Sequence, residues 1–316
     1  MDKNVYFVLF ESIHLKTKLK PLFRMNLLSL EGWGKEEIMW LIDESISIKK
    51  KKFQYADALK NKTLLMLFEK PSTRTRVSFE AAMTQLGGHS IYLDIKTTNT
   101  SSLEDDMRCI SRYADIIMAR VFKHETLKIM EKSSKVPVIN GLCNTYHPCQ
   151  ILADLMTIKE KFGKFEGLKL AYIGDGNNVC NSLIEGCTKV GIKISVATPK
   201  GYEPDKKITE SAKKSNLLEL TTNPKTAVKG ADIIYTDTWI SLGQENDKDK
   251  KVNDFKGYTV NKELLGNAKF MHCLPAYRGK EVSIDVMDSK NSIVFEQAEN
   301  RLHIQKAIIL KLLGVI

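Results

Sequence analysis

The 316-residue sequence lacks the features that mark membrane-spanning and disulfide-stabilised proteins. No apolar run approaches the roughly 20 residues that a membrane-spanning helix needs. No two cysteines form a C-x-x-C pair, and no signal-peptide pattern is present. We therefore expect a protein of the cytoplasm, with reduced thiols at Cys109, Cys143, Cys149, Cys180, Cys187 and Cys273.

The sequence also lacks the patterns that accompany nucleic-acid binding. The formal net charge is +10, but the lysines are spread along the whole chain. No zinc-finger spacing and no RNA-binding aromatic motif goes with them. Attraction of small anionic substrates is the simpler use of this charge.

Internal repeats and low-complexity segments are absent, and short apolar strands alternate with helix-like segments instead. Continuous apolar strands of this kind are typical of parallel sheets that are buried on both faces. One series of predicted strands is Leu64–Phe68, Ser90–Leu93, Ile116–Arg120 and Val136–Asn140. A second is 169–174, Lys193–Ala197, Ile233–Thr236, Phe270–His272 and Ile293–Phe295.

The two series predict an α/β fold with two doubly wound parallel-sheet domains and the active site in the cleft between them. Residues 1–24 read as an N-terminal extension, 25–158 as the first domain and 159–297 as the second. A helix at Gln150–Lys161 should join the domains, and a C-terminal helix from Ala298 (298–316) should complete the first. The mixed-sign run Glu245–Lys251 suits a solvated loop.

The strongest local signal is the run Ser72-Thr73-Arg74-Thr75-Arg76, which follows a predicted strand and opens a helix. Free backbone N–H groups and the helix dipole favour an anion at such a place. Hydroxyl and guanidinium groups add donors that match phosphate oxygens. The run therefore predicts a phosphate site, although an ordinary Ser/Thr N-cap is the alternative.

Other polar groups follow the predicted strands, where ligands of open α/β sheets bind. Arg120 ends one strand, Asn177 and Asn178 follow another, and His272 with Cys273 closes a third. The asparagines could bind a ligand carboxylate or belong to an ordinary turn. A nicotinamide cofactor is disfavoured, because Val179 replaces the third glycine of the dinucleotide motif begun by Gly174.

His147 and Asp237 also stand at element ends. His147 precedes Pro148 at a helix start, where an imidazole is favoured in its neutral form, although a capping or core histidine fits as well. Asp237 could bind a ligand amine or cap a helix. Cys273 could form an amine-binding pair with Asp237, although a lone cysteine is more often an inert core residue.

Taken together, six motifs resemble the ornithine carbamoyltransferases. They are FEKPSTRTRVSFE, HPCQILAD, GDGNN, DTWISLGQE, MHCLPA and FEQAENR, in the order found in that family. The resemblance runs from about Met25 to the C-terminus. It implies transfer of a carbamoyl group from carbamoyl phosphate to L-ornithine, giving citrulline and phosphate, in arginine biosynthesis or the arginine deiminase route. It further implies no metal, no organic cofactor, and a homotrimer or a multiple of trimers without nucleic-acid or membrane partners.

The resemblance also implies roles for individual residues. Domain 25–158 would bind carbamoyl phosphate and domain 159–297 would bind ornithine. The carbamoyl phosphate residues would be Ser72, Thr73, Arg74, Thr75, Arg120, His147, Gln150, Cys273, Leu274 and Arg301. The ornithine residues would be Asn178, Asp237, Ser241, Leu242 and Cys273. Arg74, Arg120, His147 and Cys273 would be catalytic.

The chain departs from the family pattern at three places. Leu242 stands where methionine is usual, Asn144 stands where aspartate is common, and the loop Lys96–Ser101 lacks the usual glutamine and glycine-containing stretch. Two alternatives to the ornithine enzyme stay open. One is a carbamoyltransferase for another amine, such as putrescine, and the other is an inactive paralogue that binds an anion.

Overall fold

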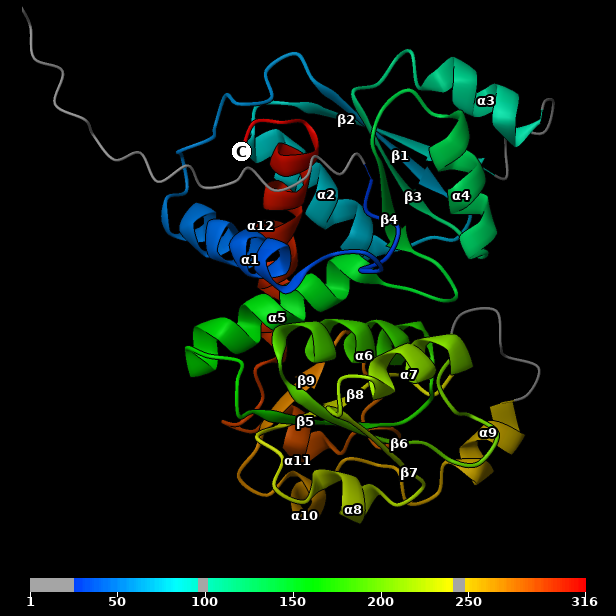
Figure 1. Ribbon diagram of the computed structural model, residues 1–316, viewed down its shortest axis with the longest axis vertical. Coiled ribbons are helices and arrows are strands. Elements are labelled where there is room, and N and C mark those ends of the chain that lie inside the picture. Colours follow the sequence, from blue (N-terminus) through cyan, green and yellow to red (C-terminus); the bar gives the residue numbers. More distant parts are fainter. Residues whose placement is uncertain (1–25, 96–101, 241–247) are drawn as a thin grey trace, which may run out of the picture.

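The computed structural model describes residues 26–95, 102–240 and 248–316, which form two lobes, each built on one parallel sheet (Figure 1). In the first lobe the strand order is β2-β1-β3-β4. Its strands are β1 (Thr63–Phe68), β2 (His89–Asp94), β3 (Ile116–Arg120) and β4 (Val138–Leu142). Its helices are α1 (Lys35–Lys50), α2 (Thr73–Gln85), α3 (Leu103–Ile110) and α4 (His124–Ser133).

The second lobe has a five-stranded parallel sheet in the order β7-β6-β5-β8-β9. Its strands are β5 (Lys169–Ile173), β6 (Lys193–Ala197), β7 (Leu218–Thr221), β8 (Ile233–Thr236) and β9 (Lys269–His272). Its helices are α6 (Asn178–Val190), α7 (Lys206–Lys213), α8 (Pro224–Val228), α9 (Lys248–Asp254), α10 (Lys262–Leu265) and α11 (Ile284–Met287). The α/β class with two parallel sheets is therefore confirmed.

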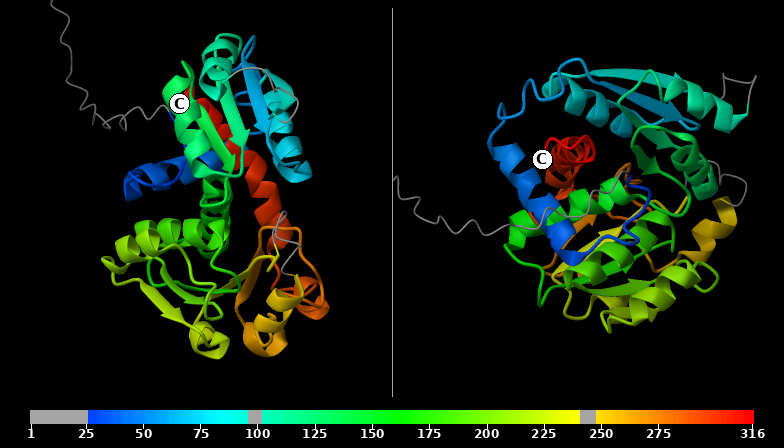
Figure 2. Two further views of the ribbon diagram at one scale, coloured as in Figure 1. Left: turned by 90° about the vertical axis from the view of Figure 1, so that its right-hand side faces the viewer. Right: turned by 45° about the horizontal axis from the view of Figure 1, so that its top comes forward.

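Two helices connect the lobes: α5 (Pro148–Phe162) and α12 (Val294–Leu312) (Figure 2). The C-terminal helix α12 packs against α5, α1 and α2, which cover its apolar residues. Ile304, Ala307 and Ile308 are buried there, as the sequence requires of a helix with so many apolar positions. One continuous apolar core runs through α5 and α12 and includes Met66 of the first sheet and Tyr172 of the second.

The central strands are buried on both faces because helices cover each side of each sheet. Leu65 and Leu67 of β1 pack under α3 and α4, whereas Leu64 and Met66 face the core shared with α5 and α12. This arrangement explains why the strands read as continuous apolar runs instead of alternating ones.

The order of strands reverses once in each sheet, between β1 and β3 and between β5 and β8. Crevices form outside the carboxyl ends of strands at such switch points, and ligands bind there. The loop after β1 leads to Ser72, β3 ends at Arg120, β5 leads to Asp175, and Asp237 follows β8. Both switch points therefore present polar residues.

Four sequence predictions need correction. Residues 293–295 do not form a strand, because Ile293 is the N-cap of α12, and Ser292 makes an isolated bridge to Phe270 of β9. Helix α12 accordingly begins at Val294, four residues before the predicted start. The short edge strand β7 was not predicted, since none of its four residues is fully buried, and Glu219 and Leu220 are exposed. Strand β4 lies two residues later than expected.

The charge run around Lys251 also differs from the prediction of a solvated loop. Residues 241–247 lie outside the described part, but 248–254 form helix α9. Lys251 is buried, and its Nζ lies 2.6 Å from Asp175 Oδ2. The helix is thereby attached to the loop after β5.

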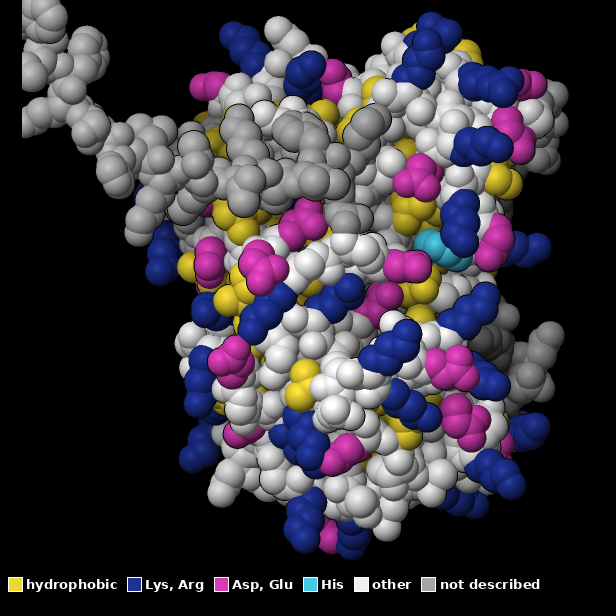
Figure 3. All heavy atoms as spheres, viewed as in Figure 1, with side chains coloured by type: hydrophobic (Ala, Val, Ile, Leu, Met, Phe, Trp, Pro, Cys, Tyr) yellow, Lys and Arg dark blue, Asp and Glu magenta, His cyan; other side chains and the backbone are white. Residues whose placement is uncertain are grey.

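One face of the molecule shows the charge spread over both lobes, in agreement with the sequence. On the face drawn in Figure 3, Lys and Arg side chains occur over both lobes and do not gather into one patch. In the described residues no helix is both long enough and apolar enough to cross a membrane.

We predict that the packing of α12 carries much of the stability. Ile308→Ala should destabilise the protein by about 2–5 kcal/mol, because it leaves a cavity in the shared core. The matched change Ile284→Ala, at a residue 62% exposed, should cost less than about 0.5 kcal/mol. Denaturant unfolding followed by circular dichroism measures both, and equal losses would contradict the account.

Candidate active site

A cavity of about 620 Å³ lies between the lobes and is lined by residues from both. The first lobe contributes the start of α2, Arg120 and His147. The second contributes the loops after β5, β8 and β9, with Asn178, Asp237 and Cys273. The prediction that the strand-end polar residues meet in one place is therefore supported by the lining of this cavity.

The start of α2 forms the first wall. Ser72 is the N-cap, and its Oγ accepts a hydrogen bond from Thr75 N at 3.3 Å. Arg120 donates to Thr75 Oγ1 at 3.3 Å, so strand β3 and helix α2 are joined at the cavity. Arg74 is exposed and lines the cavity. The first turn of α2 has no acidic residue, so the helix dipole and the arginines act together on an anion.

Several cationic side chains lie close together at this wall, and the pKa values of two of them are lowered. Burial lowers the pKa of Lys70 to about 8, and the nearby Arg120 contributes to this fall. Burial likewise lowers the pKa of Arg120 to about 10, with Arg301 and Arg74 adding repulsion. A bound dianion would relieve both costs, because opposite charge favours the protonated form of each group. The first wall therefore favours the binding of a ligand with two negative charges.

His147 stands at the junction of the lobes as the N-cap of α5. Its backbone N–H donates to Ser182 Oγ of α6 at 2.8 Å, which fixes the residue between the lobes. Burial, with the nearby Arg301 and Arg120, holds the pKa of the imidazole well below its usual range. The neutral form expected from the sequence is therefore favoured. Its Nδ1 is buried and has no hydrogen-bond partner among the described residues.

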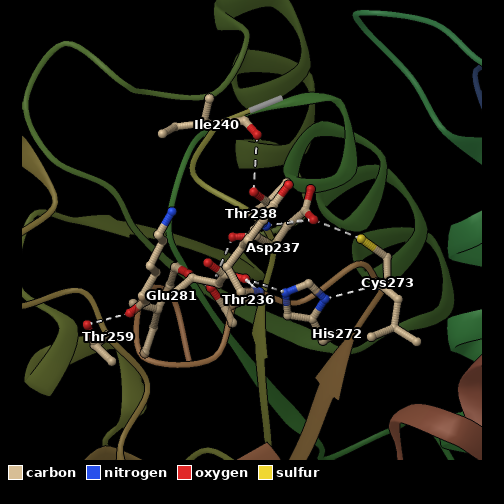
Figure 4. Close-up of polar contacts among 12 residues, drawn as sticks. Thr236, Asp237, Thr238, Ile240, Thr259, His272, Cys273 and Glu281 are labelled. Carbon is tan, nitrogen blue, oxygen red and sulfur yellow. Dashed lines mark hydrogen bonds and ion pairs between the residues drawn. The ribbon is translucent and has the colours of Figure 1, made fainter. Parts of the chain in front are cut away.

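The opposite wall carries a carboxylate–thiol pair (Figure 4). Cys273 Sγ donates to Asp237 Oδ1 at 2.9 Å, and Asn177 Nδ2 donates to Asp237 Oδ2 at 2.8 Å. Burial and the Asp237 charge raise the pKa of the Cys273 thiol well above its usual range. The thiol is therefore a protonated hydrogen-bond donor rather than a nucleophilic thiolate.

The loop after Cys273 is held by His272. Leu274 has a positive φ of 59°, and its N–H donates to His272 Nδ1 at 2.8 Å. The other ring nitrogen, Nε2, lies 3.4 Å from the buried Glu281 carboxylate. Ligand atoms of Asp237, His272 and Cys273 lie within 4.8 Å of one another, a spacing that a metal ion could use. In this structure, however, hydrogen bonds already occupy His272 Nδ1 and the Cys273 thiol.

The glycine loop after β5 serves packing. A Cβ on Gly176 would lie 2.3 Å from Pro204 N, because the backbone at 202–204 passes directly against it. Asn177 caps α6 by accepting from Val179 N and Cys180 N, and Asn178 Nδ2 donates to Cys143 O at 2.6 Å. Asn178 still lines the cavity, so the turn and the binding interpretations of these asparagines are compatible.

The remaining predicted residues fall into two groups. Arg301 lines the cavity, whereas Gln150 is buried behind it and accepts from Arg301 Nη1 at 2.6 Å. Ser241, Leu242 and the loop Lys96–Ser101 lie outside the described residues. Sequence reasoning assigned no role to Lys70, Asp154 or Gln297. For Asp154 a signal existed, since a charged residue stands among buried apolar neighbours in the helix.

A cavity between two α/β lobes, with an anion-binding helix start facing a carboxylate–thiol pair, defines an enzyme that joins a phosphorylated donor to a second small molecule. The family follows from comparison with known proteins. Residues 25–160 match the aspartate/ornithine carbamoyltransferase carbamoyl-P binding domain, and 166–312 match the Asp/Orn binding domain. The chain belongs to the aspartate/ornithine carbamoyltransferase family.

Individual relatives agree. The chain is 50% identical to an ornithine carbamoyltransferase of Methanosarcina acetivorans, over 92% of this chain and 99% of the relative. The solved ornithine carbamoyltransferase of Pyrococcus furiosus is 48% identical, with a TM-score of 0.88 over 92% of this chain and 97% of that one. The Thermus thermophilus structure is 43% identical, with a TM-score of 0.85 over 92% and 99%.

We predict that Lys70 makes anion binding dependent on pH. Below its pKa of about 8 the ammonium attracts an anion, and above it this attraction is lost. The affinity for sulfate, which stays a dianion throughout, should therefore fall as the pH rises from 7 to 9. Lys70→Arg, which stays charged, should flatten this dependence, whereas Lys70→Met should weaken binding at pH 7 and approach the wild type near pH 9. Calorimetric titration measures this, and identical pH profiles for wild type and Lys70→Arg would contradict it.

Proposed function

We propose that this protein is an ornithine carbamoyltransferase that converts carbamoyl phosphate and L-ornithine to L-citrulline and phosphate. The observation that carries the proposal is the single cavity in which the anion site at Ser72–Thr75 faces the Asp237–Cys273 pair. The first suits the phosphate of carbamoyl phosphate, and the second suits an amine. Relatives named ornithine carbamoyltransferase, one of them named anabolic, support citrulline synthesis.

The reaction needs no covalent enzyme intermediate. The neutral side-chain amine of ornithine attacks the carbamoyl carbon, a C–N bond forms, and negative charge develops on the carbonyl oxygen. The C–O bond to phosphate then breaks, and the amine proton passes to the leaving phosphate. Holding both substrates in one cavity in the correct orientation supplies a large part of the rate enhancement.

The groups that stabilise the developing charge are those of the first wall. Arg74, Thr75, Arg120 and His147 are assigned to the carbonyl oxygen and the leaving phosphate. A well-placed donor of this kind is typically worth about 3–4 kcal/mol of transition-state stabilisation. His147 acts as a neutral donor or acceptor, as its low pKa favours. Gln150 contributes through Arg301, which it contacts.

The groups that bind the acceptor substrate, ornithine, are those of the opposite wall. The Asp237 carboxylate attracts the amine, and the protonated Cys273 thiol fixes the orientation of that carboxylate. Asn178 is assigned to the α-amino acid end of ornithine, together with Ser241 and Leu242 by family resemblance. The backbone at Cys273 and Leu274 is assigned to the carbamoyl group. The Ser72–Thr75 segment, including Thr73, is assigned to phosphate.

The domain organisation is part of the proposal. Residues 25–158, completed by 298–316, form the carbamoyl phosphate domain, and 159–297 form the ornithine domain, after an N-terminal extension of residues 1–24. The packing of α12 on α1 and α5 supports its place in the first domain. By family analogy the enzyme is a homotrimer or a multiple of trimers. We place it in the cytoplasm because of its free cysteines.

Arg74→Ala tests the proposed function most simply. Citrulline formation should fall at least about a hundredfold, because a charged donor to the transition state is lost. Arg76→Ala is the matched control, since Arg76 pairs with Glu80 on the surface of the same helix and should retain nearly full activity. A colorimetric citrulline assay measures both variants. Substantial turnover by Arg74→Ala would refute the role assigned to that residue.

Cys273 variants test the non-covalent mechanism. Cys273→Ser keeps a donor to Asp237, whereas Cys273→Ala removes it. We expect the alanine variant to raise the KM for ornithine roughly tenfold, the effect of about 1.4 kcal/mol, and the serine variant to raise it less. Steady-state kinetics at saturating carbamoyl phosphate measures this. Complete inactivity of both variants, with intact folding, would indicate a nucleophilic cysteine instead.

A further inference from the structure

Asp154 lies in the middle of α5, is fully buried, and accepts hydrogen bonds from three side chains. Gln150 Nε2 donates to its Oδ1 at 2.9 Å, and Gln297 Nε2 donates to the same oxygen at 2.7 Å. Tyr235 OH donates to Oδ2 at 3.0 Å. These donors come from α5, α12 and β8, so the cluster joins the two lobe-connecting helices to the second sheet.

The acceptor determines which way each glutamine amide points. An amide has an NH₂ end and an oxygen end, and a carboxylate oxygen accepts only from the NH₂ end. Because Asp154 Oδ1 receives both NH₂ groups, both amide oxygens must point away from it. Gln150 Oε1 then accepts from Arg301 Nη1 at 2.6 Å, and Gln297 Oε1 accepts from His272 N at 2.9 Å.

Both of these second contacts end at the cavity. Arg301 lines it directly, and His272 immediately precedes Cys273 and Leu274, which also line it. One buried carboxylate is therefore connected, through one glutamine on each side, to two parts of the cavity wall that belong to different elements. Asp154 itself is 0% exposed and does not line the cavity.

A purely stabilising role explains this arrangement less well. Burial raises the pKa of Asp154 to about 7, so keeping a carboxylate here is costly, despite the hydrogen bonds that oppose the shift. Replacing a buried charge and its partners by apolar side chains is often neutral or stabilising in proteins. The orientation of two glutamine amides towards a binding site explains why a carboxylate is present here despite this cost.

We propose that Asp154 is a positioning residue that, by orienting Gln150 and Gln297, holds Arg301 and the Cys273–Leu274 segment in place for the carbamoyl group. This proposal rests on the proposed function for the identity of the ligand. It concerns the carbamoyl end of the cavity, because the phosphate end at Ser72–Thr75 is held by α2 and Arg120 without Asp154.

The experiment compares Asp154→Ala and Asp154→Asn with the wild type. Asparagine keeps an oxygen for both amide NH₂ groups, and its own NH₂ can face the Tyr235 oxygen, whereas alanine removes the acceptor altogether. Tyr235→Phe is the matched control. It removes the hydrogen bond from Tyr235 OH to Asp154 Oδ2 and the one from Gln297 Nε2 to Tyr235 OH, but leaves the hydrogen bonds from both amides to Asp154 Oδ1 in place.

The readout is the ratio of the affinities for carbamoyl phosphate and inorganic phosphate, measured by calorimetry, with the melting temperature alongside. Asp154→Ala should reduce this ratio at least about tenfold while phosphate affinity stays within about threefold of wild type. Asp154→Asn should retain most of the ratio. Tyr235→Phe should lower the melting temperature yet keep the ratio.

An unchanged ratio in folded Asp154→Ala, or an equal loss in Tyr235→Phe, would overturn the proposal in favour of a structural role. If the alanine variant does not fold, Gln297→Met tests the branch to His272 N. It should raise the KM for carbamoyl phosphate, and an unchanged KM for carbamoyl phosphate would overturn the proposal. Because the ratio needs no turnover, wild type that binds carbamoyl phosphate but forms no citrulline would refute the proposed function alone.

Discussion

The packing of α12 against α5 is the constraint on which the cavity depends. These two helices carry the continuous core from one sheet to the other, and they bring residues separated by more than 140 positions into contact. Asn300 of α12 donates to Thr157 of α5 at 2.9 Å, and Gln297 donates to Asp154. The distance and angle between the lobes, and hence between the anion site and the Asp237–Cys273 pair, follow from this contact.

The cationic side chains around the cavity are held in positions that disfavour their charged forms. Lys70, Arg120 and Arg301 are partly or wholly buried near one another, and burial lowers the pKa of each. Repulsion from neighbouring arginines adds to the fall for Lys70 and Arg120. A dianionic substrate supplies the missing countercharge. Burying these cations therefore lowers the stability of the folded protein, but it leaves a site that is preorganised for negative charge, as electrostatic catalysis requires. On the opposite wall, burial and the negative charge of Asp237 raise the pKa of the Cys273 thiol and keep it protonated.

Much of this could be predicted from the sequence. Apolar strands ending in unusual polar residues indicated the edge of each sheet at which ligands bind, and the Ser72–Thr75 run indicated an anion at a helix start. Both inferences use local patterns, so a single sequence suffices. The strand expected at 293–295 was wrong because the N-cap and first two residues of α12 form a short apolar run that resembles a buried strand. The contact with β9, a single bridge at Ser292, cannot be read from that run.

The cluster around Asp154 was beyond sequence reasoning for a different reason. Its partners Gln297 and Tyr235 lie 143 and 81 residues away, so no local pattern connects them. The low pKa of Lys70 likewise arises from burial and from Arg120, which the chain brings close only on folding. Gln150 lies behind Arg301 instead of at the cavity surface, a position that depends on side-chain packing.

The most direct test of the account is to incubate the purified protein with carbamoyl phosphate and, in parallel, L-ornithine, putrescine or L-aspartate, and to measure each carbamoylated product. The account predicts citrulline from ornithine and little product from the other two, because the proposed function assigns Asn178 to the amino acid end of the acceptor and Asp237 to its side-chain amine. Product from putrescine or aspartate, with none from ornithine, would be consistent with the proposed phosphate site but would contradict the proposed acceptor site. No product from any amine, together with measurable carbamoyl phosphate binding, would contradict the assignment as an enzyme.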